Sequence, residues 1–251
     1  KYIKNIHGIL HRALDMAMRV EYLTKNTSTY TIRPKVEEKQ VVPLDAPEQK
    51  KLFEALKGNP FETLFLTATF TGMRIGELIG LTWDCVDFAK GTLLIDKQLQ
   101  RTPGHGYGTS TYDLAPTKSD RARKITAPPF VLSLLKQERS WQAEAHLQVG
   151  QAWRDTGLIF TNELGEALRP YTVYKGFKKL ADQIGLPTAR FHDLRHTFAT
   201  TALQNGVDVK TVSSMLGHYD AGFTLRTYTH ATRQKQDEAA ATMGSFMEQV
   251  M

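Results

Sequence analysis

Apolar side chains recur with a helical period at the start of this chain. Between residues 3 and 22 they return every three or four positions, which predicts one amphipathic helix. These positions are Ile3, Ile6, Leu10, Ala13, Ala17 and Val20. A lone helix of that length is marginal in water, so we expect it to be the last helix of a preceding domain. Residues 23–43 are polar and contain two prolines, which predicts an exposed linker.

A second, mainly helical unit is expected to begin at Asp45. Asp45 and Glu48 have the spacing of a capping box, which predicts a helix through Leu56. Thr71-Gly72 separates the next two apolar segments. Further helices are expected at 61–70, from within 73–81, at 128–148, and near 170–184, 192–204 and 208–216.

A few short segments predict a small antiparallel sheet. Residues 92–96 and 121–126 have the composition of strands, and the glycine-rich connection between them is expected to be a hairpin or loop. Residues 158–168 are expected to form a short strand and turn. The predicted fold class is therefore mainly α with a small antiparallel β-sheet, an α+β arrangement.

The charge of the chain and its single cysteine indicate which kinds of partner and which cell compartment to expect. The 251 residues are 41% hydrophobic, which is ordinary for a globular protein, and carry a net charge of +6. Residues 1–39 hold eight basic and four acidic residues, a pattern that suits contact with phosphates and equally suits a solvated helix and linker. The single cysteine, Cys85, is expected to be buried, in a reducing, cytoplasmic setting. No signal peptide or membrane span is evident, and a chain that begins at Lys1 is expected to be a fragment.

Two arginines and a histidine have the spacing of an anion site. His192 and Arg195 are three residues apart and share a helix face, where a guanidinium can bind two phosphate oxygens. Arg74 follows Thr71-Gly72 at an expected helix start, where backbone amides favour an anion, and Glu77 could brace it. Solvated surface pairs remain an alternative for both sets.

The other candidate residues are a lysine, a histidine and a tyrosine. Lys118 lies between the two predicted strands and could donate a proton to a leaving alkoxide, with Lys97 and Lys124 as competitors. His218 follows Gly217 at an expected helix end. Tyr228 lies ten residues further on, and Tyr219 is its local competitor. A phenol has a pKa of about 10, so it needs a base and nearby cations to act as a nucleophile.

Metal and phosphate-loop sites are not supported by spacing. His192 and His196 could share a metal, but Asp193 stands where zinc peptidases carry Glu and no third ligand follows. His196 is therefore expected to be structural, and no cofactor or metal is expected. The glycine-rich residues 104–108 lack the spacing of a phosphate loop.

Together these motifs resemble the catalytic domain of tyrosine recombinases, in particular the integrases of phages and conjugative transposons. The resemblance covers residues 44–230, and its catalytic set would be Arg74, Lys118, His192, Arg195, His218 and Tyr228. The first 39 residues resemble the end of the core-binding domain. The implied organisation is a last core-binding helix at 1–22, a linker at 23–43, a catalytic domain at 44–230 and a tail helix at 231–251.

The resemblance implies a mechanism for cutting and rejoining DNA. Tyr228 would attack the scissile phosphate and form a 3′-phosphotyrosyl bond, while Arg74, Arg195 and His218 stabilise the non-bridging oxygens. Lys118 would protonate the 5′-oxygen, and His192 would assist proton transfer at the tyrosine. Two rounds of exchange through a Holliday junction would then join two duplexes.

The resemblance also implies partners. We expect a nucleoid-associated bacterial enzyme that binds double-stranded recombination sites as a dimer to tetramer. An apolar stripe in residues 231–251 could dock on a neighbouring subunit or on its own domain. Two alternatives are an enzyme like the type IB topoisomerases and a non-catalytic DNA-binding relative.

Overall fold

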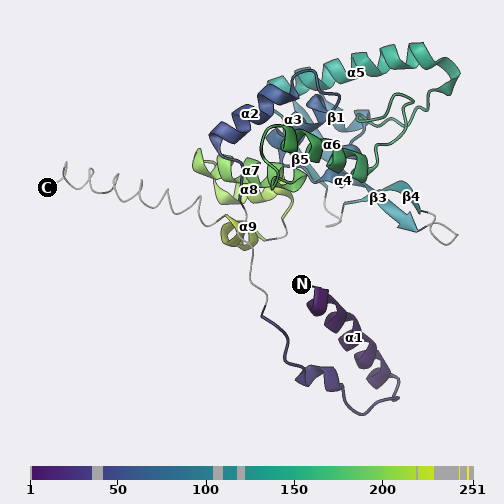
Figure 1. The fold of residues 1–251 in the computed structure, drawn as a ribbon, viewed down its shortest axis with the longest axis vertical. Helices are drawn as coiled ribbons and strands as arrows, with labels where there is room; N and C mark the ends of the chain where they lie inside the picture. Colours follow the sequence, from purple (N-terminus) through teal and green to yellow (C-terminus); the bar gives the residue numbers. More distant parts are fainter. Residues whose placement is uncertain are drawn as a thin grey trace. The chain divides into compact units, whose positions relative to one another are not determined.

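The computed structural model describes residues 2–35, 42–103, 110–117, 122–218 and 220–228, together with Met243 and Glu248. Contacts divide the chain into two compact units, Lys1–Gln40 and Val41–Met251. Each unit has its own internal packing (Figure 1).

The first unit contains the predicted amphipathic helix. Helix α1 (Tyr2–Arg19) is followed by the short helix η1 (Thr27–Tyr30). No residue of α1 is buried, and side chains of the predicted stripe such as Ile3 and Ile6 are exposed. The expected apolar stripe is therefore present and lacks cover within the described part of this unit.

The second unit is built mainly from helices. Its α-helices are α2 (Ala46–Leu56), α3 (Glu62–Thr71), α4 (Ile75–Ile79), α5 (Pro129–Val149), α6 (Pro170–Gln183), α7 (Phe191–Gln204), α8 (Val209–Leu216) and α9 (Ala221–Thr227). Two short 3-10 helices are η2 (Trp83–Cys85) and η3 (Gly150–Ala152). The predicted capping box is present at α2, where Asp45 and Glu48 each bond the other's backbone N–H.

Two small antiparallel sheets accompany these helices. Strands β1 (Val86–Asp87), β2 (Thr92–Ile95) and β5 (Arg123–Thr126) form one sheet in the order β1-β2-β5. Strands β3 (Lys97–Pro103) and β4 (Ser110–Pro116) form a hairpin that projects from the helical body of this unit (Figure 1). The predicted fold class, mainly α with a small antiparallel sheet, is confirmed.

Helix α3 is the centre of the main core. Six of its ten residues, three of them threonines, are buried, and they are spread around the helix, as expected for a helix surrounded by other elements. Phe65 of α3 packs against Phe177 of α6 and Phe191 of α7, with ring centroids 5.5 and 5.9 Å away. These aromatic contacts fix the start of α7 against α3, which matters because α7 carries His192 and Arg195.

A second, smaller core joins the last three helices. Its buried residues are Ala199, Leu203, Val212, Leu216 and Tyr228. This core therefore packs α7 against α8, and it includes Tyr228, the residue that directly follows α9. Helix α9 was not predicted from the sequence, because seven residues are too few for a clear helical period.

The prediction of a short strand within residues 158–168 is wrong. Residues 158–168 make two isolated bridges, Thr82 to Leu158 and Thr161 to Ala167, around a turn and no continuous strand. The side chain of Gln142 on α5 donates to the carbonyls of Leu158 and Ile159 at 3.0 and 2.8 Å. A side chain thus satisfies carbonyls that a neighbouring strand would otherwise bond.

Gly72, which ends α3, has a conformation and surroundings that favour glycine. Its φ is +63°, and an added Cβ would lie 2.5 Å from Phe198 Cδ1 and 2.8 Å from Leu216 Cδ2. We expect Gly72→Ala to lower the free energy of unfolding by roughly 2–4 kcal/mol, from left-handed strain plus overpacking. Urea unfolding measures this change.

Gly58→Ala is the matched control for this prediction. Gly58 also has a left-handed backbone, with φ +73°, but an added Cβ would meet nothing within 4 Å. It should show the backbone cost alone, about 1–2 kcal/mol. Equal losses in the two variants would contradict the packing described around Gly72.

Candidate active site

Three arginines from three different elements converge on the end of helix α8. The backbone carbonyls of residues 215–217 accept, in order, from Arg123 Nε, Arg195 Nη2 and Arg74 Nη2, at 2.8, 2.7 and 3.4 Å. The last carbonyls of a helix lack partners within it and carry partial negative charge. The end of α8 is therefore a natural anchor for guanidinium groups.

Helix α8 ends at Gly217 for a local reason. Gly217 has φ +63°, the left-handed cap that the sequence predicts. A Cβ there would lie 2.8 Å from Arg123 Nη1, so the absence of a side chain also makes room for the arginine.

Glu77 is the acidic partner of two of these arginines. Its carboxylate, 1% exposed, accepts from Arg123 Nη1 and Nη2 at 3.0 and 2.6 Å, and from Arg74 Nη1 at 2.9 Å. Burial alone would raise the pKa of Glu77. The bonds and charge of Arg123, and then of Arg74, outweigh burial and lower this pKa to about 2. The predicted ion pair between Glu77 and Arg74 is thus present, and the Glu77 carboxylate in it is buried.

Arg195 lies deeper than the other two arginines. It is 4% exposed, and its Nη1 donates to the carbonyl of Gly72 at 2.6 Å. This bond ties α7 to the end of α3. Burial, with the charge of Arg74, lowers the pKa of Arg195 to about 9, so the group remains a cation at neutral pH.

Both predicted site histidines lie at this cluster of arginines. Burial and then the charges of Arg195 and Arg74 lower the pKa of His218 to about 4, so its ring is neutral at pH 7. His218 Nδ1 lies 2.7 Å from Thr224 Oγ1, and a hydroxyl that donates there leaves the ring proton on Nε2. The pKa of His192 is also lowered, by partial desolvation and then by the charge of Arg195, although the residue keeps an exposed face.

Tyr228, the predicted nucleophile, is buried and hydrogen-bonded to a histidine. It is 3% exposed within the second core, and its hydroxyl lies 2.9 Å from Nδ1 of His196. Burial raises the pKa of Tyr228 to about 12, although the charge of Arg195 opposes the change. His196, which the sequence indicates as structural, is thus the hydrogen-bonding partner of the predicted nucleophile.

The remaining predicted residues are only partly described. Lys118, Tyr219 and most of the tail at 231–251 lie outside the described residues. Of the competing lysines, Lys97 pairs with Asp84 at 3.4 Å, and Lys124 is an exposed residue of β5. Cys85 is buried, as predicted.

Sequence reasoning missed Arg123, although a signal was present. Arg123 and the buried Ile125 are two residues apart on β5, so they face the same side of the strand. An arginine on the inward face of a strand needs a buried partner, and Glu77 is that partner.

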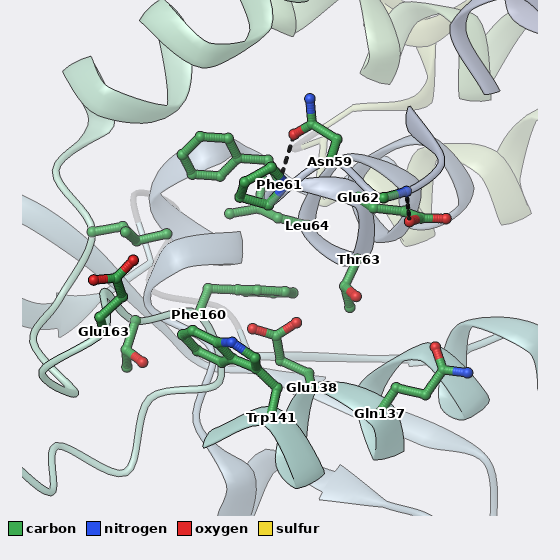
Figure 2. Close-up of a pocket in the computed structure, with 14 residues that line it drawn as sticks. Asn59, Phe61, Glu62, Thr63, Leu64, Gln137, Glu138, Trp141, Phe160 and Glu163 are labelled. Atoms are coloured by element: carbon green, nitrogen blue, oxygen red, sulfur yellow. Dashed lines mark hydrogen bonds between the residues drawn. The ribbon is translucent and has the colours of Figure 1, made fainter. Parts of the chain in front are cut away.

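A separate cavity of about 400 Å³ opens between the start of α3 and α5. Figure 2 shows Glu138 and Trp141 of α5 beside Phe160, with Phe61 on the α3 side. Burial raises the pKa of Glu138 to about 7, although a hydrogen bond with Thr63 acts to lower it. Among the predicted catalytic residues that the structure describes, none lines this cavity.

Across the described residues, no helix is long and apolar enough to cross a membrane, and no group of three His, Cys, Asp or Glu side chains could hold a metal ion.

The buried Glu77 makes stability depend on pH in a defined window. Its pKa falls from 4.5 to about 2 on folding, so its contribution is complete above about pH 4.5 and is lost as the pH falls toward 2. We expect the difference in free energy of unfolding between the wild type and Glu77→Gln to shrink by roughly 3 kcal/mol across that window. Urea unfolding at a series of pH values measures it.

Glu144→Gln serves as the control, because Glu144 is exposed on α5. It should follow the wild type at every pH. A Glu77→Gln curve that also runs parallel to the wild type would contradict the buried ion pairs.

Solved structures share this fold. The Tn1549 transposon integrase in complex with transposon right end DNA matches with a TM-score of 0.76 at 21% identity, over 95% of this chain and 79% of that one. A lambda integrase dimer bound to a COC′ core site matches with a TM-score of 0.63 at 19% identity, over 90% and 72% of the two chains. The fold is therefore that of the tyrosine recombinase catalytic domain.

Sequence relatives agree with the fold. A tyrosine recombinase XerC-like protein of Caldanaerobacter subterraneus subsp. tengcongensis is 33% identical over 256 residues, covering 97% of this chain and 66% of that protein. An integrase of Streptomyces ambofaciens is 26% identical, covering 96% and 63%. The chain thus spans slightly less than two thirds of the length of these relatives. The sequence pattern of the phage integrase family matches residues 43–235, so the chain belongs to this family of tyrosine recombinases.

Proposed function

We propose that this chain cuts and rejoins DNA strands as part of a site-specific recombinase, the integrase of a mobile genetic element. The observation that carries the proposal is the excess of positive charge at the end of α8. Three guanidinium groups meet there, and one carboxylate, Glu77, accompanies them. A phosphodiester is the anion that such a cluster would accept.

The donors that would hold the phosphate come from Arg74 and Arg195. A guanidinium has five N–H groups, and the described side-chain bonds use two on each of these arginines. His218 would add a neutral N–H donor from Nε2. Donors fixed in advance stabilise the charge that develops on the non-bridging oxygens, which is the largest contribution in many enzymes.

The proposed reaction is a pair of transesterifications. The Tyr228 oxygen would attack phosphorus, forming the 3′-phosphotyrosyl bond as the bond to the 5′-oxygen breaks. Lys118 would give a proton to that oxygen, and His192 would assist removal of the phenolic proton. The 5′-hydroxyl of a partner strand would then attack phosphorus and release the tyrosine. The phosphotyrosyl bond conserves the energy of the broken bond, so no cofactor is required.

The proposed partners are double-stranded recombination sites and further copies of the chain. The structures of the Tn1549 integrase with transposon end DNA and of the lambda integrase dimer on a core site support this part of the proposal. Assembly into a dimer to tetramer would bring two duplexes together, with the tail at 231–251 docking in trans. The proposed site of action is the bacterial cytoplasm, at the nucleoid.

The proposal predicts a covalent protein–DNA adduct that needs Tyr228. Nicked duplexes from the ends of the element that carries the gene should give a shifted band on a denaturing gel with EDTA present. Tyr228→Phe loses only the phenolic oxygen and should abolish this band. Tyr30→Phe, at an exposed tyrosine of the first unit, should leave it unchanged.

Other outcomes of this experiment would support a different nucleophile or a different function. A band that survives in Tyr228→Phe would move the nucleophile, with Tyr219 the next candidate. Relaxation of supercoils without strand exchange would support an enzyme like the type IB topoisomerases. Tight binding without an adduct in any variant would support a non-catalytic DNA-binding protein.

A further inference from the structure

We infer that His196 is a positioning residue for the nucleophile. In the state described here, its imidazole holds the Tyr228 hydroxyl in a buried resting position, which the phenol must leave before strand cleavage. The inference rests on the proposed function in one respect, that Tyr228 is the nucleophile. It adds a role for a histidine outside the predicted catalytic set.

The contact between the two side chains is direct. Nδ1 of His196 and the Tyr228 hydroxyl lie 2.9 Å apart, within hydrogen-bonding distance. Their ring centroids are 5.8 Å apart, and the rings are tilted by 57°. Among the described hydrogen bonds, this is the one that the Tyr228 hydroxyl makes, and none joins it to the three arginines.

The surroundings of Tyr228 make this position stable. The ring lies among Ala199, Leu203, Val212 and Leu216, so it contributes to the small core between α7 and α8. A buried phenol costs free energy unless its hydroxyl has a partner. The half-buried His196 supplies that partner at the edge of this core, so the ring is buried and the hydroxyl is hydrogen-bonded.

The same surroundings prevent reaction from this position. Burial and then the nearby His192 lower the pKa of His196 to about 4, while Asp193 opposes and Arg195 and Arg190 add to the change. Burial raises the pKa of Tyr228 to about 12. Transfer of the phenolic proton to His196 is therefore disfavoured, because both pKa shifts oppose it. His196 retains the phenol and does not serve as its base.

Release of the phenol involves helix α9. Tyr228 directly follows this seven-residue helix, and Thr224 within it bonds His218, one of the proposed phosphate donors. Movement of the hydroxyl toward the arginines would thus shift the end of an element that is already tied to the phosphate site. In its resting position the Tyr228 hydroxyl would bond His196, and in its reactive position this bond would be absent.

Two variants of His196 separate retention from other roles. His196→Leu removes the hydrogen bond, whereas His196→Asn retains a polar atom near the position of Nδ1. Without DNA, nitration of Tyr228 by tetranitromethane, followed by peptide mass spectrometry, reports how often the phenol is exposed. We expect His196→Leu to be nitrated about tenfold faster than the wild type, the factor expected for one lost hydrogen bond, and His196→Asn to lie near the wild type.

Single-turnover cleavage of a nicked duplex at saturating protein provides the second readout. A retaining role predicts that His196→Leu cleaves at least as fast as the wild type. Cleavage slowed tenfold or more, with nitration unchanged, would overturn the inference and make His196 a base. Unchanged nitration and unchanged cleavage would overturn it as well.

A third measurement does not depend on substituting His196. In Tyr228→Phe, the ring is kept and the oxygen is lost, so the ¹⁵N resonance of His196 Nδ1 should shift relative to the wild type. An unchanged resonance would overturn the inference even if His196→Leu failed to fold. Wild-type protein that forms no adduct with DNA would instead count against the proposed function, because nitration and the resonance are measured without DNA.

Discussion

The carbonyl groups at the end of helix α8 hold the three arginines of this site together. Three consecutive carbonyls there each accept from a different arginine, and the buried Glu77 joins two of those arginines to each other. Three like charges so close together repel, and the carboxylate with the negative end of the helix offsets only part of that repulsion. The cluster is held in place by protein groups and still favours the approach of an anion.

The fold places these groups by connecting elements that are distant in sequence. Arg74 precedes α4, Arg123 lies on β5, and Arg195 lies on α7, which aromatic rings fix against α3. Each guanidinium also bonds backbone of another element, so the arginines are part of the tertiary structure as well as of the proposed chemistry. Tyr228, the proposed nucleophile, lies in the smaller core, where its hydroxyl bonds His196 and none of the described hydrogen bonds joins it to the arginines.

Local signals in the sequence were sufficient for much of this arrangement. The capping box at Asp45, the break at Gly72, the two strands β2 and β5 and the contact between Arg74 and Glu77 depend on residues close in sequence or on local composition. Arg123 on Glu77 and His196 on Tyr228 join residues 46 and 32 positions apart, and no spacing rule links them. Helix α9 is too short for a visible period, and Lys118 lies outside the described residues.

We propose that the three arginines assemble a site for the scissile phosphate. A crystal structure of Tyr228→Phe bound to a recombination-site duplex tests it most directly, since this variant should bind without cutting. We expect one backbone phosphate within hydrogen-bonding distance of Arg74, Arg195 and His218, with Arg123 still bonded to Glu77. A duplex whose phosphates all lie away from the end of α8 would contradict a phosphate site at these arginines.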